Sequence, residues 1–176
     1  MKNLFFAAAF LASVSSFGQG QFQQETVNFL TAASGKIMQL AEAVPEEKYE
    51  WSPQEGVRSF SGVLHHVVSA NYFFATKMGA ELPEGVNMET LKDDLSSKED
   101  YAAALQQSFD LVTETLKSAD EATLKEKVEF PFPGEYTGMS TALILLSHAN
   151  EHLGQLIGYT RMNGITPPWS EGQASN

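Results

Sequence analysis

The chain has 176 residues, no cysteine, and 22 acidic against 11 basic side chains, which gives a net charge of −11 at pH 7. Without cysteine, disulfides, thiolate nucleophiles and thiolate metal ligands are excluded. The basic residues are scattered rather than clustered, so we expect neither nucleic acid nor an anionic membrane surface as a partner. A small-molecule substrate is the expected ligand.

Residues 1–18 have the features of an export signal. Lys2 precedes an apolar run from Leu4 to Val14, and small residues follow as far as Gly18. This run is shorter than the roughly 20 residues that span a membrane, so we expect no stable membrane insertion of the mature chain. The predicted location is the bacterial periplasm or the medium. The mature chain, residues 19–176, is long enough for one domain with its own core.

Four later segments show helical periodicity, because their apolar residues recur at spacings of three and four. Ser59 and Ser97 are good N-cap residues, and Pro45, Gly79 and Gly164 provide stop signals. The predicted helices span residues 21–44, 59–78, 97–118 and 139–163.

The connections between these helices are long. Two are predicted as loops, and the third, which contains Pro131, Pro133 and Gly134, is predicted to be irregular or a short strand. They comprise residues 46–58, 79–96 and 125–138. No segment has a convincing strand pattern, so the sequence predicts an all-α four-helix bundle with long inter-helix loops.

All four histidines fall in two of the predicted helices, as His65-His66 and as the pair His148 and His152. Residues four apart project from the same face of a helix, and histidine is the commonest side-chain metal ligand. A third imidazole from another helix would complete a three-nitrogen site with open coordination positions. We therefore predict a divalent-metal site formed by His66, His148 and His152. On spacing alone, core histidines that are merely hydrogen-bonded remain an alternative.

Helical geometry separates the two adjacent histidines. His66 shares its face with Val63 and Phe73, whereas His65 lies on the side of Ser61 and Ser69. We therefore expect His66 to point inward and His65 to be exposed.

In the last helix, His148, His152, Gln155 and Tyr159 form a single stripe. Leu143 and further leucines cover much of the opposite side. We therefore expect this helix to be buried on both flanks, with the polar stripe facing the interior of the bundle.

Ligand histidines usually donate their second N–H to an acceptor outside the coordination sphere. Gln155 and Glu151 are the candidates here, although Glu151 lies off the stripe and is equally suited to the surface. Tyr159 either hydrogen-bonds into the site or fills the core, and the core is the preferred interpretation. The segment Phe130–Gly134 forms a pocket wall or packs as an ordinary loop.

Two stretches resemble the DinB-like superfamily of small four-helix bundles. They are WSPQEGVRSFSGVLHHVV at residues 51–68 and HANEHLGQLIGYTRMNGITPP at residues 148–168. The resemblance places that family's metal histidines at His66, His148 and His152. It also implies a divalent ion, zinc or nickel in the first place, and leaves a homodimer open.

The pattern and the resemblance together predict a metal-dependent hydrolase or thiol-dependent transferase of unknown substrate, without naming a catalytic base. Export argues against thiol transfer, because low-molecular-weight thiols are scarce or oxidised outside the cytoplasm. His148-x-x-Glu151-His152 also fits an inverted zinc-protease motif, but the only carboxylate side chain downstream is Glu171. A bundle that binds a metal or ligand without turning it over remains the non-enzymatic alternative.

Overall fold

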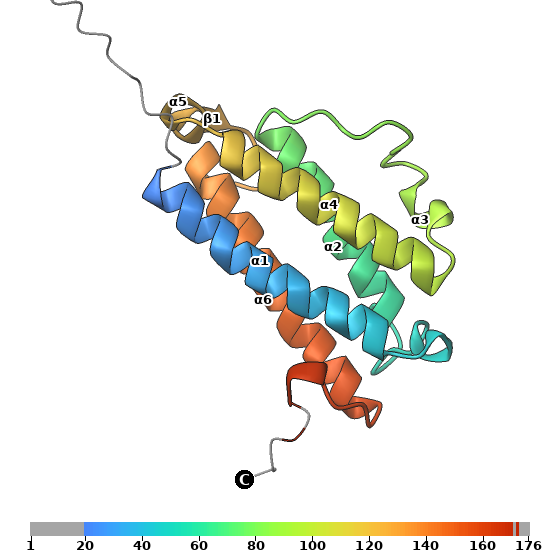
Figure 1. Ribbon diagram of the computed structural model, residues 1–176. Coiled ribbons are helices and arrows are strands. Elements are labelled where there is room, and N and C mark those ends of the chain that lie inside the picture. The colour runs from blue at the N-terminus through green and yellow to red at the C-terminus, as the bar shows by residue number, and fades with distance from the viewer. Residues whose placement is uncertain (1–19, 171, 173–176) are drawn as a thin grey trace, which may run out of the picture.

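A computed structural model describes residues 20–170 and 172. Its four long helices form the all-α bundle that the sequence predicts (Figure 1). They are α1 (Gln21–Ala43), α2 (Phe60–Lys77), α4 (Lys98–Ser118) and α6 (Gly138–Met162). Among the described residues, no helix combines the length and the apolar character needed to cross a membrane. The predicted export signal, residues 1–18, lies outside the described residues.

The helices pack so that α1 and α2 are diagonal to each other. Each of them lies against both α4 and α6. In Figure 1, α1 and α4 are in front, with α6 and α2 behind them. The centre is filled by fully buried aliphatic side chains from all four helices, among them Leu30, Ile37, Leu64, Leu105, Leu145 and Leu156.

Side-chain caps fix where α2, α4 and α6 begin. Ser59 accepts a hydrogen bond from the backbone N–H of Gly62 at 3.1 Å and starts α2, as predicted. Ser97 forms a capping box with Asp100 at the start of α4. Thr137 caps α6 by accepting from the backbone N–H of Ser140 at 3.3 Å. These caps satisfy backbone donors that have no partner within the helix.

The connections contain short elements that the sequence pattern did not predict individually. They are the 3-10 helices η1 (Glu46–Lys48) and η2 (Pro168–Ser170), the helices α3 (Leu91–Asp94) and α5 (Glu121–Lys125), and the strands β1 (Lys127–Val128) and β2 (Tyr136–Thr137). The two strands pair antiparallel, with Lys127 opposite Thr137. Each element is too short to establish a hydrophobic period. The prediction of an irregular segment or short strand over residues 125–138 is consistent with this pair.

Two burial predictions were wrong. Leu143 is 52% exposed, so α6 is not apolar and buried on both flanks. The reason is its position, since α6 packs against α1 on one side and α2 on another and presents its remaining side to solvent. His65 is half-buried rather than exposed, and its Nε2 lies 3.3 Å from the hydroxyl of Ser69.

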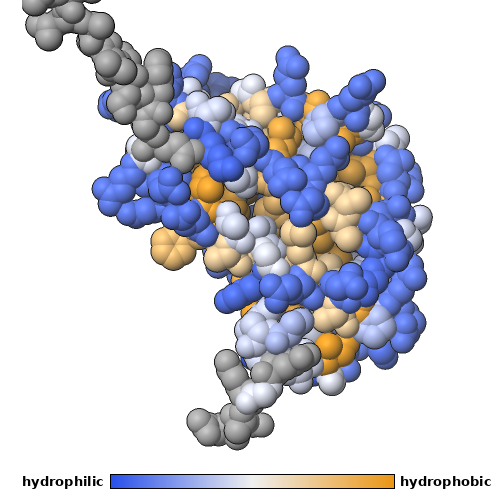
Figure 2. Space-filling view, viewed as in Figure 1, coloured by the Kyte–Doolittle hydropathy of each residue, from blue (hydrophilic) through white to orange (hydrophobic). Residues whose placement is uncertain are grey.

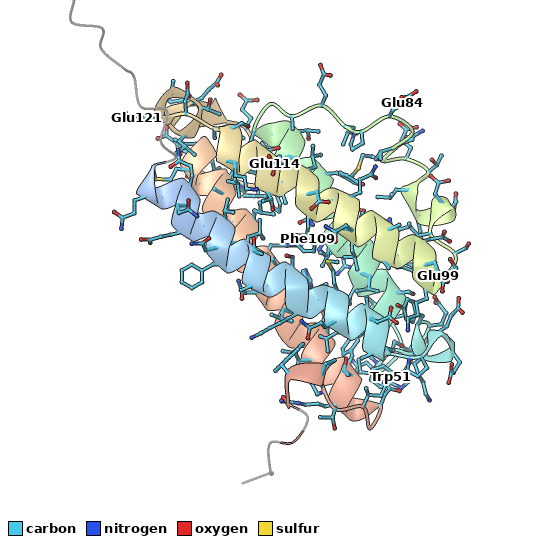
Figure 3. The ribbon with its side chains drawn as sticks, in the orientation of Figure 1. Trp51, Glu84, Glu99, Phe109, Glu114 and Glu121 are labelled. Atoms are coloured by element: carbon cyan, nitrogen blue, oxygen red, sulfur yellow. The ribbon has the colours of Figure 1, made fainter. Side chains whose placement is uncertain are left out.

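The acidic side chains lie on the surface of the bundle. Figure 2 shows that hydrophilic side chains dominate the face formed by α1 and α4, with apolar residues in the crease between the two helices. In Figure 3, Glu84, Glu99, Glu114 and Glu121 project outward, whereas Phe109 lies between α4 and α1 and is only 3% exposed.

Candidate metal centre

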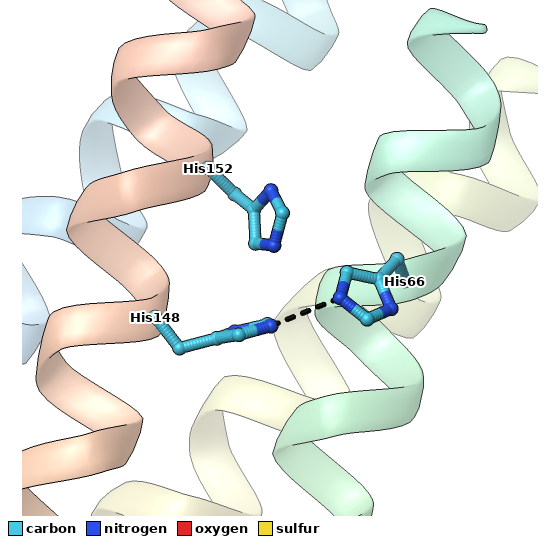
Figure 4. A group of neighbouring side chains, drawn as sticks. All are labelled: His66, His148 and His152. Carbon is cyan, nitrogen blue, oxygen red and sulfur yellow. Dashed lines mark hydrogen bonds between the residues drawn. The ribbon is translucent and has the colours of Figure 1, made fainter. Parts of the chain in front are cut away.

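Three imidazoles converge between α2 and α6 (Figure 4). His66 projects from α2, and His148 and His152 project from successive turns of α6. Their ring centroids are 4.4–4.9 Å apart, and one nitrogen from each ring lies within 4.8 Å of the others. The predicted convergence is therefore observed, and binding of a metal stays a prediction.

The spacing of two of the nitrogens suits a single metal ion. The Nε2 atoms of His66 and His148 are 3.1 Å apart. Two nitrogens bound at about 2.0–2.1 Å to one ion, with angles of about 90–110°, lie roughly 2.9–3.4 Å from each other. The distance between these two nitrogens is therefore compatible with a shared ion.

A hydrogen-bond relay orients His152. Its Nδ1 lies 2.9 Å from Oε1 of Gln155. An amide oxygen only accepts, so Nδ1 carries the proton and the lone pair of Nε2 is free for a metal. Gln155 Nε2 donates to the Tyr159 hydroxyl at 2.8 Å, and that hydroxyl donates to the carbonyl of Arg58 at 3.2 Å. The relay therefore connects a candidate ligand on α6 to the residue before the N-cap of α2.

His66 and His148 are neutral at physiological pH. Burial lowers the pKa of His66 to about 4, and the charges of Arg58 and His152 act in the same direction. Burial and the neighbouring imidazoles likewise lower the pKa of His148 to about 4. Neutral imidazole is the form that binds metals. Among the described residues, the buried side-chain atoms without a hydrogen-bond partner are His148 Nδ1 and Asn71 Oδ1.

Aromatic side chains flank the site beyond His148. The ring of Phe74 lies 5.8 Å from that of His148, and Phe130 packs 6.2 Å from Phe74 and 5.9 Å from Phe73. Phe130 and Tyr136 also line a cavity of about 300 Å³ within the β1–β2 connection. The Phe130–Gly134 segment thus contributes to an apolar wall next to the imidazoles.

Known proteins share the fold of this chain. Residues 30–156 match the DinB superfamily. The chain belongs to the DinB superfamily. It resembles the crystal structure of a DinB-like protein from Bacillus subtilis, with a TM-score of 0.64 and 19% identity over 81% of this chain and 93% of that one. A DinB-like protein from Bacillus cereus gives a TM-score of 0.67 and 18% identity over 82% of this chain and 95% of that one.

At these identities the two crystal structures establish the shared DinB-like fold alone. No curated protein matches the chain. The chemistry of this DinB-superfamily member therefore has to be argued from its own residues.

The residues around the imidazoles divide into those that contact the site and those that do not. Gln155 makes the predicted contact with His152, whereas Glu151 is exposed and forms no hydrogen bond with the imidazoles. Tyr159 is 6% exposed and also belongs to the relay, so the preference for a plain core role was incomplete. Trp51 packs against Tyr159 with ring centroids 5.4 Å apart.

Arg58 is a neighbour of this DinB-type site that sequence reasoning missed. Its carbonyl ends the relay from His152, and its charge contributes to the lowered pKa of His66. Hydrophobic periodicity gives no signal for such a residue. The available signal was Gly62, which lies four residues before His66 on the same helix face. Because glycine has no side chain, this position leaves room for a neighbouring side chain one turn before His66.

Proposed function

We propose that the protein is a metal-dependent hydrolase of the DinB superfamily, with a divalent ion, zinc or nickel, held by His66, His148 and His152. The observation that supports this most directly is the meeting of three imidazoles at one point, two of them with Nε2 atoms 3.1 Å apart. A bound ion of this kind supplies Lewis-acid chemistry, polarising a carbonyl or lowering the pKa of water or a thiol.

The protein contributes orientation and access. The relay through Gln155 and Tyr159 fixes the tautomer and ring plane of His152. Phe74 packs against His148 and keeps that side apolar. Three protein nitrogens leave coordination positions open for water and substrate, which is the arrangement typical of catalytic rather than structural zinc.

Hydrolysis is preferred over thiol transfer because the expected export removes the chain from cytoplasmic thiols. A panel of small esters and amides, assayed with and without an added low-molecular-weight thiol, separates the two reactions. Turnover without thiol that disappears in His66→Ala supports the hydrolase. Turnover that requires thiol supports a transferase, and full metal loading without turnover supports a non-catalytic metal-binding bundle.

Metal analysis tests the site itself. Purified wild-type protein should bind about one divalent ion per chain, and His66→Ala, His148→Ala and His152→Ala should each lose it. His65→Ala is the matched control, because His65 is a half-buried histidine adjacent to His66 that contacts Ser69 instead of the cluster. Undiminished metal in all three cluster variants would refute the proposal.

We also propose that the chain is exported. The support is the basic start and short apolar run within residues 1–18. Expression in a bacterium, followed by fractionation and N-terminal sequencing, should yield a periplasmic or secreted chain that begins close to residue 19. An uncleaved chain in the cytoplasm would contradict export while leaving the metal site untouched.

A further inference from the structure

The backbone of Arg58 is tied to the histidine cluster. Its carbonyl accepts a hydrogen bond from Tyr159, and Tyr159 accepts one from Gln155, the partner of His152. Arg58 belongs to the loop before α2, yet the relay holds it to α6. Its position relative to the imidazoles is therefore fixed by contacts with both helices.

The side chain of Arg58 starts on the face of α2 that carries His66. A β-carbon added to Gly62 would lie 3.5 Å from Cβ of Arg58 and 3.9 Å from its Cγ. Gly62 and His66 are four residues apart and so share a helix face. The side chain of Arg58 therefore begins about one helical turn before His66 on this face.

The guanidinium of Arg58 is exposed and has no acidic partner. Within residues 20–170 it forms no ion pair and no side-chain hydrogen bond. A positive charge beside a divalent-metal site repels the ion, so this residue does not help to hold a metal. Its planar fork is instead suited to bidentate binding of a carboxylate or a phosphate.

We propose that the site takes small molecules that carry an oxyanion, a carboxylate or phosphate, and that Arg58 binds this group next to the imidazoles. This inference rests on the proposed function, because it names the substrate class of the same site.

A matched pair of probes tests the proposal. They are 3-phenylpropanoate and its neutral amide, 3-phenylpropanamide, titrated by calorimetry at pH 7 into zinc-loaded and metal-free full-length protein. The wild type should prefer the acid, and Arg58→Gln should weaken binding of the acid roughly tenfold to a hundredfold. Arg58→Lys should retain part of the preference, because it keeps the charge without the fork. Both variants keep the backbone carbonyl that Tyr159 contacts.

Lys92→Gln is the control for a general charge effect. Lys92 is exposed and its charge acts on His65, so this variant should keep the preference for the acid. Equal binding of acid and amide by the wild type, or no binding of either, overturns the proposal. A preference that needs zinc and survives Arg58→Gln also overturns it, since the carboxylate then binds the metal.

The outcomes separate this inference from the proposed function. An Arg58-dependent preference in the metal-free protein supports the oxyanion site even if the metal analysis fails. One bound ion per chain without any acid preference removes the oxyanion site and leaves the metal site standing.

Discussion

The α1–α4 and α2–α6 helix pairs differ in what lies between them. Hydrogen bonds between α1 and α4 in the described chain lie at their ends, from Gln23 to the carbonyl of Ala119 and from Lys98 to the carbonyl of Val44. In α2–α6, the contact between His66 and His148 lies in the middle of the pair. One pair is packed for stability, whereas the other accepts buried polar groups.

This difference has an energetic reason. A buried polar group without a partner costs about 1–3 kcal/mol, and Nδ1 of His148 is such a group in the metal-free fold. The fully buried leucines at the centre of the bundle offset this penalty, because apolar burial contributes about 25 cal/mol per Å². The bundle can therefore tolerate a polar site on one side as long as the opposite pair remains well packed.

The largest expected effect comes from substitutions of buried leucines in the α1–α4 pair. Leu30 and Leu105 are both 0% exposed, and replacement of either by alanine should lower the free energy of unfolding by about 2–5 kcal/mol. Urea denaturation measures this change. The metal content per folded molecule should stay at the wild-type value, because neither side chain belongs to the cluster. A loss of metal from the folded variants would show that the two helix pairs are coupled.

The next effect concerns metal affinity. Gln155→Leu removes the acceptor of the His152 N–H while keeping a similar volume, and should weaken metal binding roughly tenfold to a hundredfold in a chelator competition. Asn150→Ala is the matched control, since Asn150 is an exposed amide on the same helix that bonds only the carbonyl of Leu146. Equal affinities of the two variants would contradict a role for the relay.

A smaller effect is expected one step along the relay. Tyr159→Phe keeps the ring that packs against Trp51 but removes the hydroxyl between Gln155 and the carbonyl of Arg58. We expect a loss of about 0.5–1.5 kcal/mol in unfolding free energy and a weaker effect on metal affinity than that of Gln155→Leu. A larger loss of metal than in Gln155→Leu would place Tyr159, rather than Gln155, in direct control of the site.

The sequence predicted the bundle well because its signals are local. The caps Ser59 and Ser97 and the stop at Gly164, whose φ is +72°, mark helix ends through short-range chemistry. The convergence of His66 with His148 and His152 followed from helical periodicity combined with the family resemblance. The short connecting elements were missed because none is long enough to show a period.

Other features depend on tertiary packing and could not be derived from spacing. The exposure of Leu143 follows from which two helices cover α6, and the half-burial of His65 follows from the neighbours of α2. Arg58 was overlooked because a charged residue in a loop is expected to lie on the solvated surface. Its link to Tyr159 joins residues 101 positions apart.

The two helix pairs should also differ in how acid affects their stability. This difference is absent at neutral pH and develops on acidification. The pKa values of His66 and His148 are lowered to about 4 in the metal-free fold, from 6.5 for an exposed histidine. Between these values the unfolded chain binds more protons than the folded one, so acid favours unfolding. The free energy of unfolding of the metal-free protein should therefore have its full value above about pH 6.5 and fall as the pH approaches 4.

Urea titrations at several pH values measure this dependence. The double variant His66→Gln/His148→Gln should show a shallower fall, with a remainder from His65, whose pKa burial also lowers. Asp100, whose pKa hydrogen bonds from Ser97 lower to about 2, loses its contribution only below about pH 4, outside the histidine window. If the unfolding free energy of the double variant changes with pH as steeply as that of the wild type, these imidazoles are solvated in the metal-free protein. Water then reaches the space between α2 and α6.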